Sequence, residues 1–194
     1  ISNLVPVVII NSEVDAENVF CVLCDDKLGT LKAVEHLIKK GYKNIIYFQN
    51  TDTYSAKLKV QGYQTGIQNN SKTVSSSHVI KVSMGLEGGI EGVNQIEAFK
   101  YEKYAILCSD DACALGALKR LQQIGKTIPD EVGVIGFNNS IFSRCSNPEL
   151  TTVDSQMEQM GLEAVNTLAG VLEKSSEIKC TKHIQPFLVV RGSA

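Results

Sequence analysis

The feature that most constrains the fold of this chain is a regular alternation of short apolar runs with longer amphipathic stretches. The runs at 19–24 and 44–48 have the length and composition of strands covered on both faces. The stretch between them repeats its apolar residues at helical spacing, and Gly41 follows where that helix would end. Further strands are expected at 5–10, 78–83, 105–108, 132–137 and 186–191, and further helices at 54–69, 88–99, 111–124 and 157–173. This order predicts βαβ units and an α/β fold with a mostly parallel sheet.

The charge and the hydropathy of the chain argue against direct binding to nucleic acid and against a membrane span. Its 194 residues carry a formal net charge of −2, and no basic run is longer than Lys39-Lys40, so there is no electrostatic footprint for nucleic acid. No apolar run approaches the roughly 18 residues that a membrane span needs, and no signal peptide is evident at Ile1. We therefore expect a globular protein without membrane contact.

The cysteines show neither a disulfide framework nor a metal-binding pattern. There are six of them: Cys21, Cys24, Cys108, Cys113, Cys145 and Cys180. Cys21 and Cys24 form a lone CxxC within an expected strand, and no second CxxC or CxxH follows at zinc-ligand spacing. Free thiols among apolar neighbours behave as small hydrophobes. We expect no metal, and a cytoplasmic location in which thiols stay reduced.

No sequence motif supports catalysis. The chain contains no HExxH, no GxSxG elbow and no GxxxxGK[ST] phosphate loop. His36, His78 and His183 have no partners at metal-ligand spacing, and the glycines of MGLEGGIEG do not follow a strand as GxGxxG would. We expect no cofactor and no enzymatic activity. A sugar or nucleoside hydrolase, the enzyme alternative, would need a metal site or a positioned acid and base.

Polar side chains follow four of the expected strands. They are Asp25 and Asp26, Asn50 and Asp52, Ser109 to Asp111, and Asn138 and Asn139. The carboxyl ends of parallel strands share one edge of a sheet, which is where ligands bind in open α/β sheets. Asn138-Asn139 alone is also a turn signal, because Asn tolerates left-handed backbone. Four such ends together indicate a crevice whose carboxylates and amides suit a polyhydroxylated ligand.

Several longer motifs occur together and in a fixed order. They are VPVVIIN, CDDKLGTLKAVEHLIKKGYKNIIYF, SAKLKVQGY, CSDDACALGALKRLQQIGKTIPDEVGVIGFNN, NPELTTV and VVRGS. This series, which runs from residue 5 to residue 193, resembles the LacI/GalR family of bacterial transcriptional regulators. The combination of ALGAL, IPDEVGVIGF, NPELTTV and a terminal VVRGS is highly specific, whereas any one of these motifs alone would be weak.

The resemblance implies a type I periplasmic-binding-protein-like core, in which two Rossmann-like subdomains with parallel sheets face each other across a cleft. Residues 1–43 and 154–176 would belong to the N-terminal subdomain, and residues 44–153 and 177–194 to the C-terminal one. The N-terminal subdomain would be incomplete, and the helix-turn-helix headpiece that reads operator DNA in the family would be absent. We therefore expect the sequence to be a fragment of a longer regulator.

The resemblance also implies ligand contacts, position by position. Lys59 stands where the family's S-x-R-x-R-x-x-G pattern has the Arg that holds a ligand, and Ser55 begins that pattern. This is a real departure, because Lys lacks the bidentate fork of Arg. Asp111 keeps the Asp that precedes ALGAL, and Asn138 occupies the ligand-contacting position after Gly-Phe. Met84 stands about where the family often has an aromatic that stacks on the ligand.

Two further assignments follow from the same comparison of motifs. Asp25 matches the Asp of the family's V-D-N pattern, where it would contact ligand or cap the following helix. The family's dimer surface falls on Leu115, Leu118, Cys145 and Ser146, so the resemblance implies a homodimer.

The resulting hypothesis is a cytoplasmic sensor that binds a small effector, a sugar, and through that binding modulates contact with operator DNA. The ending GFNNS also resembles the maltose-type regulators of Gram-positive bacteria. The main alternative is a secreted sugar-binding protein of an ABC importer, which shares the fold. The motifs NPELTTV and VVRGS and the unpaired cysteines favour the regulator.

Overall fold

The chain forms two separate β-sheets, and the computed structural model describes residues 4–173 and 179–194. The larger sheet has the order β4-β3-β5-β6-β7-β9, and all its pairs are parallel except β7 with β9. Its strands are β3 (Asn44–Gln49), β4 (Ser76–Lys81), β5 (Tyr104–Cys108), β6 (Val132–Phe137), β7 (Thr151–Asp154) and β9 (Phe187–Val189). The smaller sheet is parallel and has the order β1-β2-β8, with β1 (Val7–Ile10), β2 (Val19–Cys24) and β8 (Thr181–Ile184).

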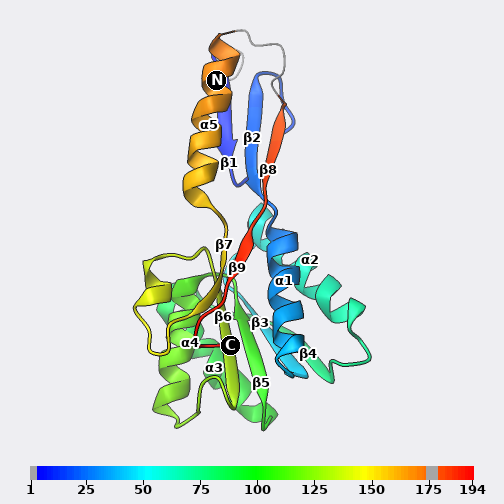
Figure 1. Cartoon of the computed structure of the whole chain (residues 1–194), viewed down its shortest axis with the longest axis vertical. Helices are drawn as coiled ribbons and strands as arrows, with labels where there is room; N and C mark the ends of the chain where they lie inside the picture. Colours follow the sequence, from blue (N-terminus) through cyan, green and yellow to red (C-terminus); the bar gives the residue numbers. More distant parts are fainter. Residues whose placement is uncertain (1–3, 174–178) are drawn as a thin grey trace.

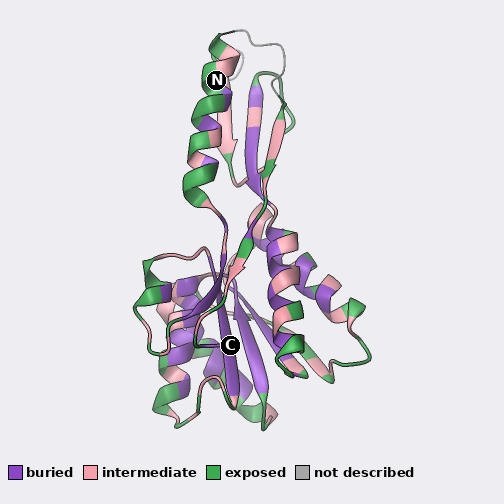
Figure 2. Ribbon diagram, in the orientation of Figure 1, coloured by how far each residue is buried: buried purple, intermediate pink, exposed green. Residues whose placement is uncertain are grey.

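Helices cover both faces of the larger sheet and one face of the smaller sheet (Figure 1). They are α1 (Asp26–Lys39), α2 (Tyr54–Asn69), α3 (Gly85–Ile96), α4 (Asp111–Gln123) and α5 (Met157–Leu172), with short 3-10 turns η1 (Glu97–Phe99) and η2 (Ile141–Arg144). The large lobe comprises the six-stranded sheet with α1 to α4, and the small lobe comprises the three-stranded sheet with α5. Figure 2 shows the central strands β3, β5, β6 and β7 of the large lobe buried, whereas much of α5 is exposed.

The large lobe has a separate apolar core on each face of its sheet. On one face, α3 and α4 pack over Ile46, Ile106 and Val134. On the other face, α1 packs beside α2 over Ile45 and Leu107. Successive residues of a strand point to opposite faces, so strands buried on both faces read as continuous apolar runs. This explains why the sequence pattern identified these strands.

The chain passes between the lobes at three places, and these connections determine where a site can form. They are the link from β2 to α1, the link from β7 to α5 and the link from β8 to β9. The last two run side by side, because β7 and β9 pair in antiparallel register with Asp154 opposite Phe187. We call the segments 154–157 and 184–187 the crossovers.

The expected α/β fold with parallel-dominated sheets is confirmed. The packing of α1 and β8, however, differs from the expected grouping of residues. The resemblance assigns residues 1–43 to the N-terminal subdomain, yet α1 packs on the six-stranded sheet through Val34 and Leu37. It assigns residues 177–194 to the C-terminal subdomain, yet β8 pairs with β2 in the small sheet. The first connection therefore lies at Asp25, before α1, and the last lies between β8 and β9.

Candidate functional site

Polar side chains gather at the carboxyl edge of the large sheet, next to the crossovers. A cavity of about 530 Å³, which we call the crossover pocket, opens there between the loop after β6 and the start of α5. It is lined by Asn138, Asn139, Ser140, Arg144, Asp154, Gln156, Met157, Glu158, Gln159 and Phe187. Because the lining comes from both the large-lobe loop and the first turn of the small-lobe helix, a ligand bound there would contact both lobes.

Asn138 and Asn139 have both of the roles considered from the sequence, the turn and the ligand crevice. Both have left-handed backbone, with φ of 97° and 50°, so they do form a turn. Both also line the pocket. The backbone N–H of Asn138 donates to the carbonyl of Val153 at 2.7 Å, and the Ser155 hydroxyl donates to its Oδ1 at 3.4 Å. Within residues 4–173 and 179–194, Nδ2 of Asn138 has no hydrogen-bond partner, so a ligand could accept from it.

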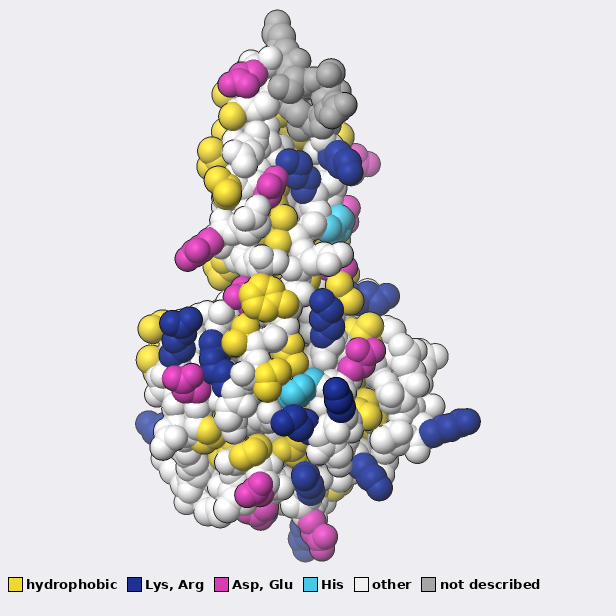
Figure 3. Space-filling view, in the orientation of Figure 1, with side chains coloured by type: hydrophobic (Ala, Val, Ile, Leu, Met, Phe, Trp, Pro, Cys, Tyr) yellow, Lys and Arg dark blue, Asp and Glu magenta, His cyan; other side chains and the backbone are white. Residues whose placement is uncertain are grey.

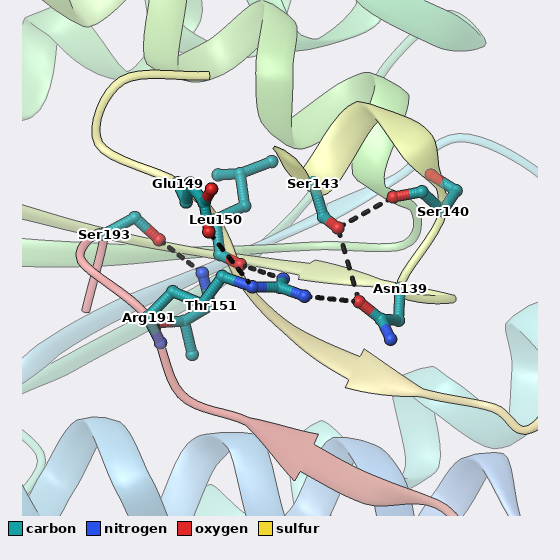
Figure 4. A network of polar contacts seen from close by, with 8 residues as sticks. All are labelled: Asn139, Ser140, Ser143, Glu149, Leu150, Thr151, Arg191 and Ser193. Carbon is teal, nitrogen blue, oxygen red and sulfur yellow. Dashed lines mark hydrogen bonds and ion pairs between the residues drawn. The ribbon is translucent and has the colours of Figure 1, made fainter. Parts of the chain in front are cut away.

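Asn139 joins the pocket loop to the segment that follows β9 (Figure 4). Its Oδ1 accepts from Nη2 of Arg191 at 2.7 Å, and its Nδ2 donates to Oδ2 of Asp154 at 2.8 Å. Arg191 also donates through Nη1 to the carbonyl of Leu150 at 2.7 Å and pairs with Glu149 at 3.5 Å. One end of this network thus faces the pocket, and the other end fixes the C-terminal segment.

Asp111 supports the pocket loop from beneath. It is buried, and its carboxylate accepts from the backbone N–H and the hydroxyl of Ser140 at 2.6 and 2.8 Å. Its other oxygen accepts from the Thr152 hydroxyl at 2.5 Å. A Cβ on Gly136 would lie 2.3 Å from that oxygen, so a glycine is needed there. Burial raises the pKa of Asp111, and the three hydrogen bonds oppose that rise. Asp111 does not line the pocket.

Lys59 is directed into the protein rather than into the pocket. Its buried ammonium donates to the carbonyl of Ser109 at 3.0 Å and lies 3.9 Å from the centre of the Phe137 ring. Burial lowers the pKa of Lys59, and the nearby carboxylates of Asp26 and Asp110 act in the opposite direction.

Asp26 is buried near Lys59, and the half-buried Ser55 lies beside Asp26. The Ser55 hydroxyl and the Cys24 thiol donate to Asp26, whose pKa is raised mainly by burial. Asp110 caps α4 by accepting from the backbone N–H of Cys113 at 2.8 Å, and Asn50 donates to its other oxygen. Asn50 and Asp110 lie at the carboxyl ends of β3 and β5, as the sequence predicted, whereas Asp26 follows β2 of the small sheet. None of these residues lines the crossover pocket.

The two remaining expected ligand residues lie elsewhere. Asp25 caps α1 by accepting from the backbone N–H of Leu28 at 2.9 Å, which is the capping role considered from the sequence. Met84 is 69% exposed at the N-cap position of α3 and does not line the pocket. Of the expected ligand residues, the crossover pocket therefore contains only Asn138.

The residues expected at a dimer surface differ in accessibility. Cys145 is exposed and Ser146 is half-buried, next to η2. Leu115 is half-buried against the core, whereas Leu118 is only 2% exposed and lies within it. The Leu118 side chain therefore stabilises its own chain and has no surface to offer a second copy. The family resemblance alone does not distinguish the two leucines.

Most of the pocket residues were not expected from the sequence, among them Gln156, Met157 and Phe187. Strand β7 is short and contains two threonines and an aspartate, so no apolar run marked it. Without β7, the pairing that places Phe187 beside Asp154 could not be foreseen.

In the part of the chain that the structure describes, no group of three or more His, Cys, Asp or Glu is arranged to hold a metal ion. Across residues 4–173 and 179–194, no helix has both the length and the apolar character to cross a membrane.

A two-lobed α/β chain with a polar pocket at its crossovers has the design of a ligand-binding domain. The model of the periplasmic binding protein-like domain matches residues 34–194, and the chain therefore belongs to that family. Its resemblance to LacI/GalR regulators is confirmed by its relatives. An HTH-type transcriptional regulator of Lachnoclostridium phytofermentans is 29% identical over 96% of this chain and 56% of its own length. The chain thus spans about half the length of the curated relatives it matches.

Two solved structures show the same fold. A LacI transcriptional regulator from a Rhodococcus species has a TM-score of 0.87 and 23% identity, covering 99% of this chain and 70% of that one. The complex of the transcriptional regulator CelR with cellobiose has a TM-score of 0.83 and 20% identity, covering 96% of this chain and 58% of that one.

Proposed function

We propose that this chain is the effector-sensing core of a LacI/GalR-type transcriptional regulator and that its effector is a sugar bound in the crossover pocket. The observation that carries the proposal is the position of Asn138, which lines the pocket with an unused amide donor next to the crossovers. An amide can both donate to and accept from hydroxyl groups, whereas a carboxylate only accepts. CelR, which has this fold, binds the disaccharide cellobiose, and this supports a sugar here.

The proposed mechanism is a shift between two arrangements of the lobes. A ligand that contacts both the β6 loop and the first turn of α5 stabilises the arrangement in which both surround it. The shift is limited by the difference between the ligand's affinities for the two arrangements. In a homodimer, such a shift would alter how two DNA-binding segments meet the half-sites of an operator. Relatives named as HTH-type regulators support this last step.

Dimerisation and location are part of the same proposal. We place the homodimer contact on the outer face of α4, near Leu115, and on the segment Cys145 and Ser146. Light scattering over a concentration series tests it, and a monomer at every concentration would contradict it. We propose a binding function rather than an enzymatic one, in the cytoplasm, in keeping with the regulator relatives.

The test is thermal unfolding of the chain with a panel of sugars that includes maltose, cellobiose and ribose. A ligand at about one hundred times its dissociation constant adds roughly 2.7 kcal/mol to the free energy of unfolding. Asn138→Gly removes the amide and keeps the left-handed backbone, so it should abolish the shift. Asn69→Ala, at the exposed end of α2, removes an amide far from the pocket and serves as the control. No shift with any sugar would contradict the proposal.

A further inference from the structure

One wall of the crossover pocket is apolar. Phe187 and Met157 both line it, and they are 48% and 61% exposed. Phe187 is the direct cross-strand partner of Asp154, and such partners point to the same face of the sheet. Since Asp154 also lines the pocket, the register directs the Phe187 ring to the pocket side. Figure 3 shows hydrophobic side chains gathered at the junction of the lobes, over β9.

The charges around the pocket do not favour an anion. Among its lining residues, Arg144 is the cation, and Asp154 and Glu158 are the anions. Arg191, which bonds to the lining residue Asn139, also donates to the carbonyl of Leu150 and pairs with Glu149. The pocket therefore has no excess of positive charge that would concentrate an anion.

We propose that the crossover pocket selects an uncharged sugar ring whose C–H face lies on Phe187 and whose hydroxyls meet Asn138. This inference rests on the proposed function and adds the ligand class and a specificity-determining residue. The ring of Phe187 supplies a flat apolar surface, as aromatic side chains do in small-molecule sites. The free Nδ2 of Asn138 supplies a directed donor from the loop after β6. Where the family often has a stacking aromatic, this chain has Met84, and we assign the stacking role to Phe187 on β9 instead.

Isothermal titration of the chain with matched ligands tests the inference. Each neutral sugar of the panel, such as glucose or maltose, is paired with its phosphate and with its sugar acid. Phe187→Ala should weaken binding of the neutral sugar by about tenfold or more. Phe187→Leu keeps an apolar side chain without the flat ring and should also weaken it, whereas Phe187→Tyr should retain it. Phe142→Ala removes an aromatic of similar exposure that lies outside the pocket and should leave affinity unchanged.

Each outcome bears on the inference in a defined way. Preferential binding of a neutral sugar with loss in Phe187→Ala supports it. Preferential binding of the phosphate or the acid overturns it and leaves the proposed sensor function standing. Neutral binding that is unchanged in both Phe187→Ala and Phe187→Leu also overturns it. If no ligand of the panel binds, the inference fails together with the proposed function.

Discussion

Nη2 of Arg191 donates to Oδ1 of Asn139 at 2.7 Å, so the segment arriving from the small lobe is tied to the loop that lines the pocket. The same amide donates to Asp154, which ends the strand that leaves for the small lobe. A single side chain therefore bonds to both connections. Its neighbour Asn138 faces the pocket. The pocket loop is therefore in direct contact with the end of β7 and with the segment that follows β9.

Replacement of Arg191 tests the strength of this connection. Arg191→Met leaves Oδ1 of Asn139 and the carbonyl of Leu150 without their donor, and should lower the free energy of unfolding by about 2–3 kcal/mol. Arg191→Lys should recover only part of the loss, because Lys lacks the planar fork. Urea unfolding of Arg191→Met, Asn139→Ala and the double variant gives their coupling. Additive effects of the two substitutions would show that the pair is not energetically connected.

Asp111 should contribute more to the free energy of unfolding than an exposed ligand-binding side chain would. Asp111→Ala leaves the Ser140 N–H and two hydroxyls without their acceptor, and should lower the free energy of unfolding by about 3 kcal/mol. Asp25→Ala removes one helix cap and should lower it by only about 1 kcal/mol. Chemical denaturation without ligand measures both. An Asp111→Ala protein as stable as the wild type would contradict the supporting role.

Substitutions at Leu115 and Leu118 of α4 should distinguish an effect on dimerisation from an effect on folding. Leu118→Ala opens a cavity in the core and should lower the free energy of unfolding by about 2–5 kcal/mol. Leu115→Ala, at a half-buried position, should cost less stability but weaken the proposed dimer. Sedimentation of each variant under folding conditions checks this. A dimer that dissociates in Leu118→Ala but not in Leu115→Ala would reverse the assignment.

The sequence predicted most of the large sheet because its strands are buried on both faces and are therefore nearly continuous apolar runs. It did not predict β7 or β8, whose threonines, lysine and histidine break such runs. The carboxyl edge was predictable from the rule for parallel strands, and Asn138 was found in that way. Phe187 was not, because its place depends on an antiparallel pair between segments more than thirty residues apart. Nor could Asp111 be recognised as a support, because its hydroxyl partners come from two other segments.

The buried carboxyl of Asp26 should make the free energy of unfolding depend on pH. The sign of that dependence follows from the direction in which its pKa is shifted. Asp26 is 2% exposed, and burial raises its pKa, while Lys59 and the Ser55 and Cys24 hydrogen bonds oppose the rise without cancelling it. Between about pH 4, the ordinary pKa of an Asp, and its raised value, the native state keeps a proton that the unfolded chain has released. The stability contributed by this proton is complete below that window and is lost as the pH rises through the native pKa.

Asp26→Asn removes the titrating group and keeps the shape of the side chain, so the variant should gain stability relative to the wild type as the pH rises from about 4 to 7. Urea unfolding of both proteins across this range measures the difference. Asp111, whose pKa is also raised by burial, contributes the same slope to both proteins and cancels in the comparison. If the variant instead loses relative stability as the pH rises, the attraction of Lys59 outweighs the burial of the carboxylate, and the group is held ionised as an ion pair.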